Sequence, residues 1–268
     1  MAYSDGPKIV TNGLVLALDA ADRNSYPGTG TIWRDLSGNN NNCSLVNEPT
    51  YSSAKGGGSI DLDGVNDYIS VPKTLNGFTY NIHYDLNWTL EFWMYTDAYD
   101  ASPQTYKFIY GSYNGCNYTS FKGNAQGIAI YSATDPNSIF LQFAYGPRNV
   151  SPGSQCPDIS ATWGYAEVGS ILWGLQNRWA HFVMTSDDGT TLKLFIDGIQ
   201  RGPNKTVSFK NSQNRIDNNL VASTDYALGG YIIGYHQIDF SIFKIYNRPL
   251  SSQEIQQNYN AQKSRFGL

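Results

Sequence analysis

The sequence predicts an all-β protein in which two antiparallel sheets pack face to face. Only 15% of the residues are charged, and 20 tyrosines and 26 glycines supply side chains that favour pleated sheets and tight turns. Short runs that alternate between apolar and polar residues recur along the chain and end in turn residues. With 268 residues, 41% of them hydrophobic, the chain can form one large sandwich with a substantial core.

Several short strands are expected in the N-terminal third. Residues 14–18 form an apolar run of strand length. Residues 37–42 are serine, glycine and asparagine, so we expect a polar turn that stays outside the core. Residues 59–64 alternate and end in Asp63-Gly64, a pair typical of turns, and residues 68–71 form the next strand.

The clearest strand spans residues 88–95. Alternation assigns Trp88, Leu90, Phe92 and Met94 to one face, and Glu91, Trp93 and Tyr95 to the other. We expect the first face to point into the core.

The segment 97–170 has a different composition, rich in tyrosine and proline. It keeps short apolar runs at 127–131 and 139–143, so we expect two or more strands joined by long loops. So many aromatic residues are not typical of a solvated coil. The segment is therefore predicted to be an aromatic-rich insertion in a single domain that spans residues 1–268.

Regular strands return in the C-terminal part. Residues 179–185 and 191–198 alternate on either side of the turn at 187–189, which predicts a β-hairpin. Further strands are expected at 231–234 and 240–246.

One helix is predicted from Ser251 to about Lys263. Ser251 and Glu254 have the S-x-x-E spacing of a capping box, which satisfies backbone N–H groups at a helix start. Ile255 and Tyr259 are four residues apart and share one face of this helix.

Composition argues against several classes of function. The formal net charge is −4 and no block of lysine and arginine occurs, so we expect no nucleic-acid partner. No apolar run reaches the roughly 18 residues of a membrane span, so we expect no membrane partner. Residues 1–20 lack the basic start and apolar segment of a secretory signal. We therefore expect a protein made in the cytoplasm without a signal peptide.

Three cysteines, Cys43, Cys116 and Cys156, occur without the close spacing of a metal-binding or redox pair. Such a sparse, odd set is typical of isolated thiols in a reducing compartment. A Cys116–Cys156 disulfide across the central segment remains an open alternative.

Candidate catalytic residues are few. Retaining hydrolysis of a glycoside needs two carboxylates about 5 Å apart, as in an E-x-D-x-x-E strand, and that spacing does not occur in this chain. His83, His181 and His236 are isolated, and no nucleophile or phosphate-binding motif is present. We expect a protein that is not an enzyme. A polysaccharide-degrading enzyme that uses Glu91 is the alternative.

Four phrases occur in a specific order along the chain: 60–69 (IDLDGVNDYI), the strand 88–95, 179–182 continuing to 195–198, and 245–255 (IYNRPLSSQEI). Together they resemble the laminin-G-like, or concanavalin A-like lectin/glucanase, family over roughly residues 55–96 and 175–262. The resemblance implies an antiparallel jelly-roll sandwich with a long central loop insertion at about 97–170 and a short C-terminal helix.

The phrase from Gly13 to Asn39 and the ending 258–268 are similar to the variety of this family found in tailed-phage structural proteins. The similarity implies a virion surface protein, either a capsid decoration or a component of the tail or fibre. Its partners would be other virion proteins, in a homo-oligomer or on a lattice. A lectin-like adhesin that binds host surface glycan is the alternative.

Members of the family often bind calcium near a sheet edge through aspartate and backbone oxygens, the hard ligands that this ion prefers. The resemblance places such a site at Asp61, Asp63, Asn66 and Asp67. No cofactor is required by this reading, and turn formation by the same side chains is the alternative.

Aromatic residues of the central segment are the candidate ligand-binding residues. Sugar rings stack on tyrosine and tryptophan, and the same side chains dominate many protein interfaces. Glycan contact, protein contact and simple loop packing all remain open. The set is Tyr99, Tyr106, Tyr113, Tyr118, Tyr145, Trp163 and Tyr165.

Overall fold

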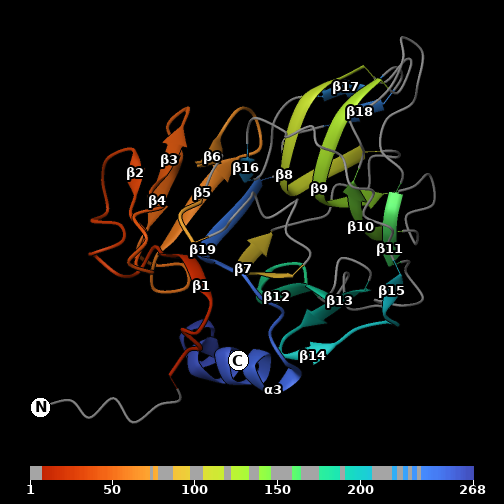
Figure 1. Ribbon diagram of the computed structural model, residues 1–268. Helices are drawn as coiled ribbons and strands as arrows, with labels where there is room; N and C mark the ends of the chain where they lie inside the picture. The colour runs from red at the N-terminus through yellow and green to blue at the C-terminus, as the bar shows by residue number, and fades with distance from the viewer. Residues whose placement is uncertain are drawn as a thin grey trace, which may run out of the picture.

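The computed structural model describes residues 8–72, 75–77, 87–96, 105–117, 122–132, 139–145, 159–163, 175–187, 191–206, 219–221, 226–228, 231–233 and 237–268, with the backbone alone for 105–163 and 219–233. Two large antiparallel sheets lie face to face, and a helix near the C-terminus covers the outer face of one of them (Figure 1). The predicted all-β sandwich with a C-terminal helix is confirmed.

One sheet has nine strands and is built around three long ones, β7 (Trp88–Thr96), β12 (Arg178–Asp187) and β19 (Gln237–Tyr246). Its other strands are β1 (Leu14–Asp19), β4 (Thr50–Ser52), β5 (Ser59–Asp63), β13 (Thr191–Ile196), β14 (Ile199–Gln200) and β15 (Lys205–Thr206). β7 lies between β12 and β19, and β19 pairs with β5 along its first half and with β1 along its second. The expected hairpin is present as β12 and β13.

The second sheet has eight strands in the order β11-β10-β9-β8-β16-β6-β3-β2. They are β2 (Ile32–Trp33), β3 (Cys43–Val46), β6 (Tyr68–Val71), β8 (Thr105–Asn117), β9 (Lys122–Ser132), β10 (Ile139–Tyr145), β11 (Ile159–Trp163) and β16 (Asn219–Val221). The aromatic-rich segment thus supplies β8 to β11 and extends this sheet. A separate pair is formed by β17 (Tyr226–Leu228) and β18 (Tyr231–Ile233).

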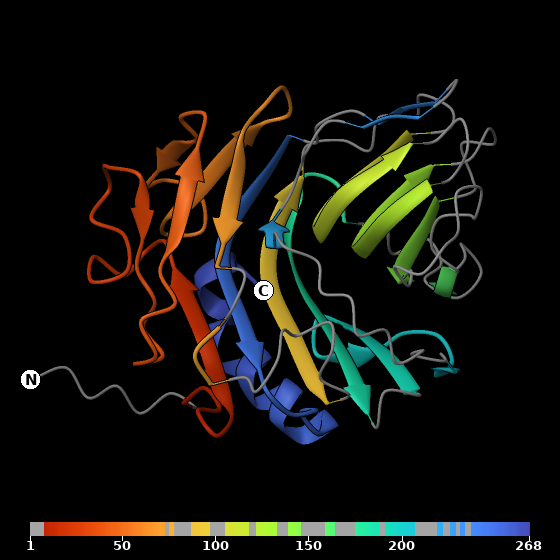
Figure 2. The ribbon, with the colours of Figure 1, turned by 45° about the horizontal axis from the view of Figure 1, so that its top comes forward.

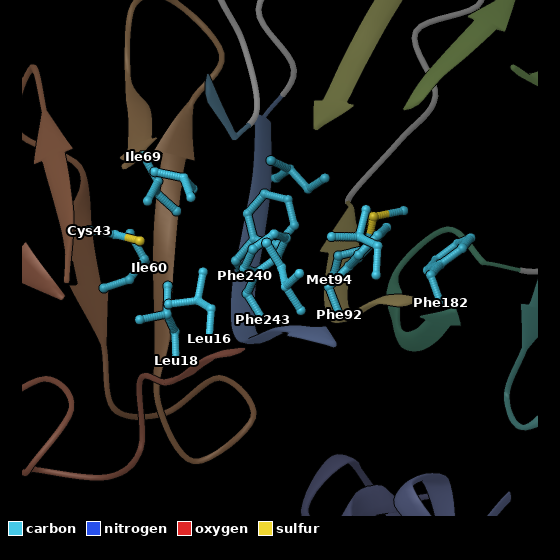
Figure 3. Close-up of a cluster of buried hydrophobic side chains, with 14 of the residues drawn as sticks. Leu16, Leu18, Cys43, Ile60, Ile69, Phe92, Met94, Phe182, Phe240 and Phe243 are labelled. Atoms are coloured by element: carbon cyan, nitrogen blue, oxygen red, sulfur yellow. The ribbon is translucent and has the colours of Figure 1, made fainter. Parts of the chain in front are cut away.

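The core lies between the two large sheets. Phe92 of β7 stacks on Phe182 of β12 with 5.4 Å between ring centroids, and on Phe243 of β19 with 6.5 Å (Figure 3). Cys43 and Ile69 reach the same cluster from the eight-stranded sheet. The alternation predicted for the strand 88–95 is confirmed, because its four apolar members all belong to this cluster.

Cys43 is a free thiol in this core, and burial raises its pKa. Cys116 lies on β8, while Cys156 lies outside the described residues. A bridge between these two stays an open alternative.

Helix α3 (Ser252–Gln262) lies on the face of the nine-stranded sheet that points away from the core (Figure 2). The predicted capping box is present, because Ser251 Oγ accepts from the Glu254 N–H and the Glu254 carboxylate accepts from the Ser251 N–H. A 3₁₀ turn, η1 (Lys263–Phe266), follows. In the described part of the chain, no helix is both long and apolar enough to span a membrane.

The asparagine-rich turn differs from expectation. Asn41 is only 2% exposed, so the prediction that residues 37–42 stay outside the core is wrong at this position. Its Nδ2 donates to the backbone oxygens of Val15 and Asn76 at 2.8 and 2.9 Å, and its Oδ1 accepts from the Asn76 N–H at 2.9 Å. A carboxamide can be buried at little cost when its donors and acceptor are all used in this way.

We expect Phe92→Ala to lower the free energy of unfolding by about 3–5 kcal/mol, because it leaves a cavity among the phenylalanine rings of β12 and β19. Denaturant titration measures this value. Val65→Ala is the control, because Val65 is 65% exposed and should change the free energy by no more than about 0.5 kcal/mol. A loss at Phe92 no larger than the control's would contradict the packing described here.

Candidate functional site

The register of the eight-stranded sheet defines which of its sides faces the core. Leu45 of β3 and Ile69 of β6 are paired, and both are buried in the core cluster. Val221, Tyr110 and Ile128 continue the same row across β16, β8 and β9. Positions in this row therefore lie on the core side of the sheet, and alternate positions lie on its outer side.

Three aromatic positions form a row on the outer side. Tyr131 is three residues beyond Ile128 on β9, so alternation assigns it to the side away from the core. It pairs with Tyr106 of β8 on one side and with Phe140 of β10 on the other. Tyr113 pairs with Ala125, which belongs to the same outer side. We call Tyr106, Tyr131 and Phe140 the outer aromatic row.

The remaining candidate aromatics are placed differently. Tyr145 pairs with Gln126, and Trp163 pairs with Leu141, which in turn pairs with Ile130. Both positions therefore share the core side with Ile128. Tyr99, Tyr118 and Tyr165 lie outside the described residues. The structure thus brings Tyr106 and Tyr113 to one side of the sheet and Tyr145 and Trp163 to the other, and a ligand-binding role for these residues stays a prediction.

Tyr131 and Phe140 were not among the aromatic residues that the sequence predicted to bind a ligand. Each lies in a short apolar run that reads simply as a strand. Only the antiparallel register places them beside Tyr106. Their proximity therefore has no local sequence signal.

In the acidic loop after β5, aspartate side chains accept hydrogen bonds from the backbone N–H groups of the loop itself. Oδ1 of Asp63 accepts from the N–H groups of Val65, Asn66 and Asp67 at 2.7, 3.1 and 3.3 Å. Oδ2 of the buried Asp67 accepts from the Asp63 N–H at 3.2 Å. Asp63 and Asp67 therefore act as turn-forming side chains in this structure.

These contacts perturb both carboxyl groups. Although burial opposes ionisation of Asp63, the backbone donors lower its pKa, whereas burial and then the charge of Asp63 raise the pKa of Asp67. Asp61 lies 3.8 Å from Lys55 Nζ. Within the described residues, no three His, Cys, Asp or Glu side chains gather so as to hold a metal ion. Calcium at Asp61, Asp63, Asn66 and Asp67 stays a prediction.

A buried polar network lies between the nine-stranded sheet and α3. Glu91 of β7 is 0% exposed. Its Oε1 accepts from Lys244 Nζ at 2.7 Å and lies 3.1 Å from His181 Nε2. Its Oε2 accepts from Nδ2 of Asn258, on α3, at 2.6 Å. Both carboxylate oxygens are therefore occupied by side chains from β12, β19 and the helix.

The network sets the charge of Glu91. Burial opposes its ionisation, but Lys244 and His181 together lower the pKa of Glu91 to about 2. Glu91 is the residue on which the alternative prediction, a polysaccharide-degrading enzyme, depended. Under α3 it has no exposed surface on which a substrate could bind, so its contacts are those of a structural residue.

Asn258 extends the network to the N-terminal segment. Its Oδ1 accepts from the Val10 N–H at 2.7 Å, and its Nδ2 also donates to the Tyr246 hydroxyl at 3.0 Å. That hydroxyl donates to the Val10 carbonyl at 3.1 Å. The side chain of Asn258, on α3, is therefore hydrogen-bonded to the N-terminal segment, to β7 and to β19.

The chain end closes the same face. Phe266 stacks on Trp93 with 4.0 Å between ring centroids and lies 5.0 Å from the ring of Trp179. Arg265 donates to both carboxylate oxygens of Asp19 at 2.8 Å. Because these partners are distant in sequence, no local pattern predicts the contacts.

Comparison with known proteins agrees with this architecture. The family model described as the concanavalin A-like lectin/glucanases superfamily matches residues 63–256. No curated protein matches the chain.

Several solved structures share the fold. The receptor binding domain of botulinum neurotoxin C/D mosaic serotype has a TM-score of 0.63 at 16% identity over 94% of this chain and 52% of that one. The binding domain of Paraclostridial Mosquitocidal Protein 1 has a TM-score of 0.61 at 18% identity over 94% and 52%. Trypanosoma rangeli sialidase in complex with the inhibitor DANA has a TM-score of 0.60 at 16% identity over 99% and 35%. The chain thus spans about half of each toxin domain and about a third of the sialidase.

The lowered pKa of Glu91 predicts sensitivity to acid. Because its pKa falls from 4.5 to about 2 on folding, the associated stability is fully present above about pH 4.5 and is lost as the pH falls toward 2. Urea titration over this range should show a decreasing free energy of unfolding. Glu91→Gln should make that decrease smaller, and an unchanged slope would contradict the assignment.

Lys244→Met should lower the free energy of unfolding by about 3–5 kcal/mol, because it leaves the buried Glu91 carboxylate without its ammonium partner. Lys193→Met is the matched control: the side chain of Lys193 is 33% exposed and its Nζ lies 3.8 Å from Asp187, so its loss should cost no more than about 1 kcal/mol. Thermal or urea unfolding monitored by circular dichroism compares the two. Equal losses would rule out a special role for Lys244.

Proposed function

The chain belongs to the concanavalin A-like lectin/glucanases superfamily, and on this basis we propose that it is a non-catalytic recognition protein that binds surface carbohydrate. The binding surface is the outer side of the eight-stranded sheet around β8, β9 and β10. The observation that carries the proposal is the outer aromatic row.

Aromatic positions in adjacent strands suit a saccharide chain. Neighbouring strands lie about 4.8 Å apart, so paired positions on three strands form a continuous stripe across a sheet. Sugar rings present apolar C–H faces that pack on aromatic rings, and polar side chains nearby bind the hydroxyl groups. Gln142 is two residues after Phe140 on β10, so its position lies on the same outer side, where it would contribute a carboxamide.

The similar structures support a recognition role by analogy of fold. Two of them are described as binding domains, one a receptor binding domain, and the third is a sialidase in complex with an inhibitor. A shared fold is a weaker argument than a shared site. The outer aromatic row, a feature of this chain itself, is the stronger support for carbohydrate binding.

The contacts of Glu91 favour recognition over catalysis. A glycosidase needs an accessible pair of carboxyl groups. Glu91 is buried beneath α3 and hydrogen-bonded through both oxygens. We therefore propose no hydrolytic step for this residue.

We place this activity on the surface of a phage particle, as a capsid decoration or as part of the tail or fibre. The sequence phrases at 13–39 and 258–268 support this setting through their similarity to tailed-phage structural proteins. Other virion proteins would hold the chain there in several copies. Several copies in a fixed arrangement raise the avidity for a repeating polysaccharide.

Tyr131→Ala and Tyr106→Ala are each expected to weaken binding of a bacterial surface polysaccharide about tenfold, because each removes a ring from the proposed stripe. A glycan array identifies a bound polysaccharide, and titration calorimetry measures its Kd. Tyr68→Ala is the matched control. Tyr68 is next to the buried Ile69 on β6, so it lies on the outer side of the same sheet but away from β8, β9 and β10.

A wild-type protein that binds no polysaccharide, or an equal loss in all three tyrosine variants, would contradict the proposed surface. Release of reducing ends from a bound polysaccharide would contradict a non-catalytic role. Binding of a protein receptor through the same tyrosines, without any glycan, would overturn the proposed ligand class.

A further inference from the structure

The eight-stranded sheet is almost free of charged residues. Within its described strands, Lys107 of β8 and Lys122 of β9 are the only charged residues, and neither aspartate nor glutamate occurs. Charged residues do occur in β1, β5, β7, β12, β13, β15 and β19 of the nine-stranded sheet. The two layers of the sandwich (Figure 1) therefore differ in electrostatic character.

Neither lysine occupies a position on the outer side. Lys107 pairs with Ile130, which is two residues beyond Ile128 on β9, so its position shares the core side with both. Lys122 is six residues before Ile128 on the same strand, and alternation assigns it to the core side as well. Every described position on the outer side of β8, β9, β10 and β11 is therefore uncharged.

The row next to the outer aromatic row supplies neutral polar groups. Phe108, Ala129, Gln142 and Thr162 pair in this order across β8, β9, β10 and β11. A carboxamide and a hydroxyl can each donate and accept hydrogen bonds, as the hydroxyl groups of a sugar do. The polar residues of this row thus match an uncharged partner.

The part of the sheet with described side chains has the same character. Ser44 of β3 and Tyr68 and Ser70 of β6 are partly exposed, and they alternate with the buried Leu45 and Ile69. The solvated side of an antiparallel sheet is usually polar. Here it is accessible but uncharged from β3 to β11, which is a property that a charged ligand does not require.

We propose that the outer aromatic row selects uncharged polysaccharides, built from hexose or N-acetylated hexosamine units, and discriminates against polymers that carry carboxylate, sulfate or phosphate groups. This inference rests on the carbohydrate-binding function proposed above and adds the chemical class of the carbohydrate. An anionic group loses part of its hydration when its sugar packs on a protein surface. A cationic donor normally compensates for this loss, and the described outer positions contain none.

The net charge of the chain acts in the same direction but over a longer range. A formal charge of −4 repels polyanions, and dissolved salt screens this repulsion beyond about 3–10 Å. The local cost of desolvating an anionic group is screened much less. Discrimination that is caused by the outer side should therefore persist at high salt.

A matched pair of polymers tests the proposal. The first is the polysaccharide that the wild-type protein binds on the glycan array, and the second is the same polymer after oxidation of its primary hydroxyl groups to carboxylates. Titration calorimetry at about 0.5 M NaCl should show binding of the oxidised polymer that is weaker by about tenfold or more. The Kd for the neutral polymer should change by less than about twofold between about 0.05 and 0.5 M NaCl.

A cation placed beside the outer aromatic row should reduce the discrimination. Gln142→Arg is expected to improve binding of the oxidised polymer about tenfold relative to the wild type, because the guanidinium can pair with the new carboxylates. Ser70→Arg is the matched control, because it adds the same charge to the outer side on β6 and should leave the ratio of the two Kd values unchanged. Circular dichroism confirms that both variants are folded, and the wild-type ratio decides the question if either is not.

Equal affinity of the wild type for the two polymers would overturn the proposed selectivity and leave the carbohydrate-binding function intact. Binding of an acidic polysaccharide on the array that depends on Tyr106 and Tyr131 would have the same meaning. Equal recovery in both arginine variants would assign the discrimination to net charge and overturn the role of the outer side. Absence of binding to any polysaccharide would contradict the proposed function itself, and this inference with it.

Discussion

An ionised carboxylate at the middle of the nine-stranded sheet constrains much of the structure around it. A buried carboxylate without partners costs several kcal/mol, so the negative charge of Glu91 must be balanced by a nearby positive charge and both of its oxygens must be hydrogen-bonded. Lys244 comes from the neighbouring strand and Asn258 from α3. The helix cannot leave the sheet without exposing or unpairing this group. Helix position and sheet stability are therefore coupled through one side chain.

This coupling explains why a weakly apolar helix has a defined position. Ile255 and Asn258 are the buried residues of α3, and the surface of the helix is rich in carboxamides. Apolar contact alone tolerates sliding, whereas a hydrogen-bonded network accepts one geometry. The stacking of Phe266 on Trp93 then closes the end of the helix over the same face. The polar contacts of Glu91 and Asn258 thus fix the position of α3, and the aromatic contact of Phe266 buries apolar surface of the sheet.

The two faces of the sandwich consequently serve different purposes. The chemically rich face of the nine-stranded sheet, with its glutamate, lysine and histidine, is covered and internal. The outer side of the eight-stranded sheet carries the aromatic row contributed by β8, β9 and β10. Catalytic-looking residue types are thus used for assembly, while the proposed recognition surface is built from strands of the aromatic-rich segment.

Local patterns in the sequence determined the elements: alternation over residues 88–95 assigned the faces of β7, and the Ser251–Glu254 spacing set the start of α3. Such signals depend on the backbone geometry of neighbouring residues, so a sequence displays them directly. The partners of Glu91, the burial of Asn41 and the pairing of Tyr106 with Tyr131 were decided only by the tertiary structure. Register and charge neutralisation join segments far apart in the chain, and their energies depend on burial that exists only once both sheets have formed.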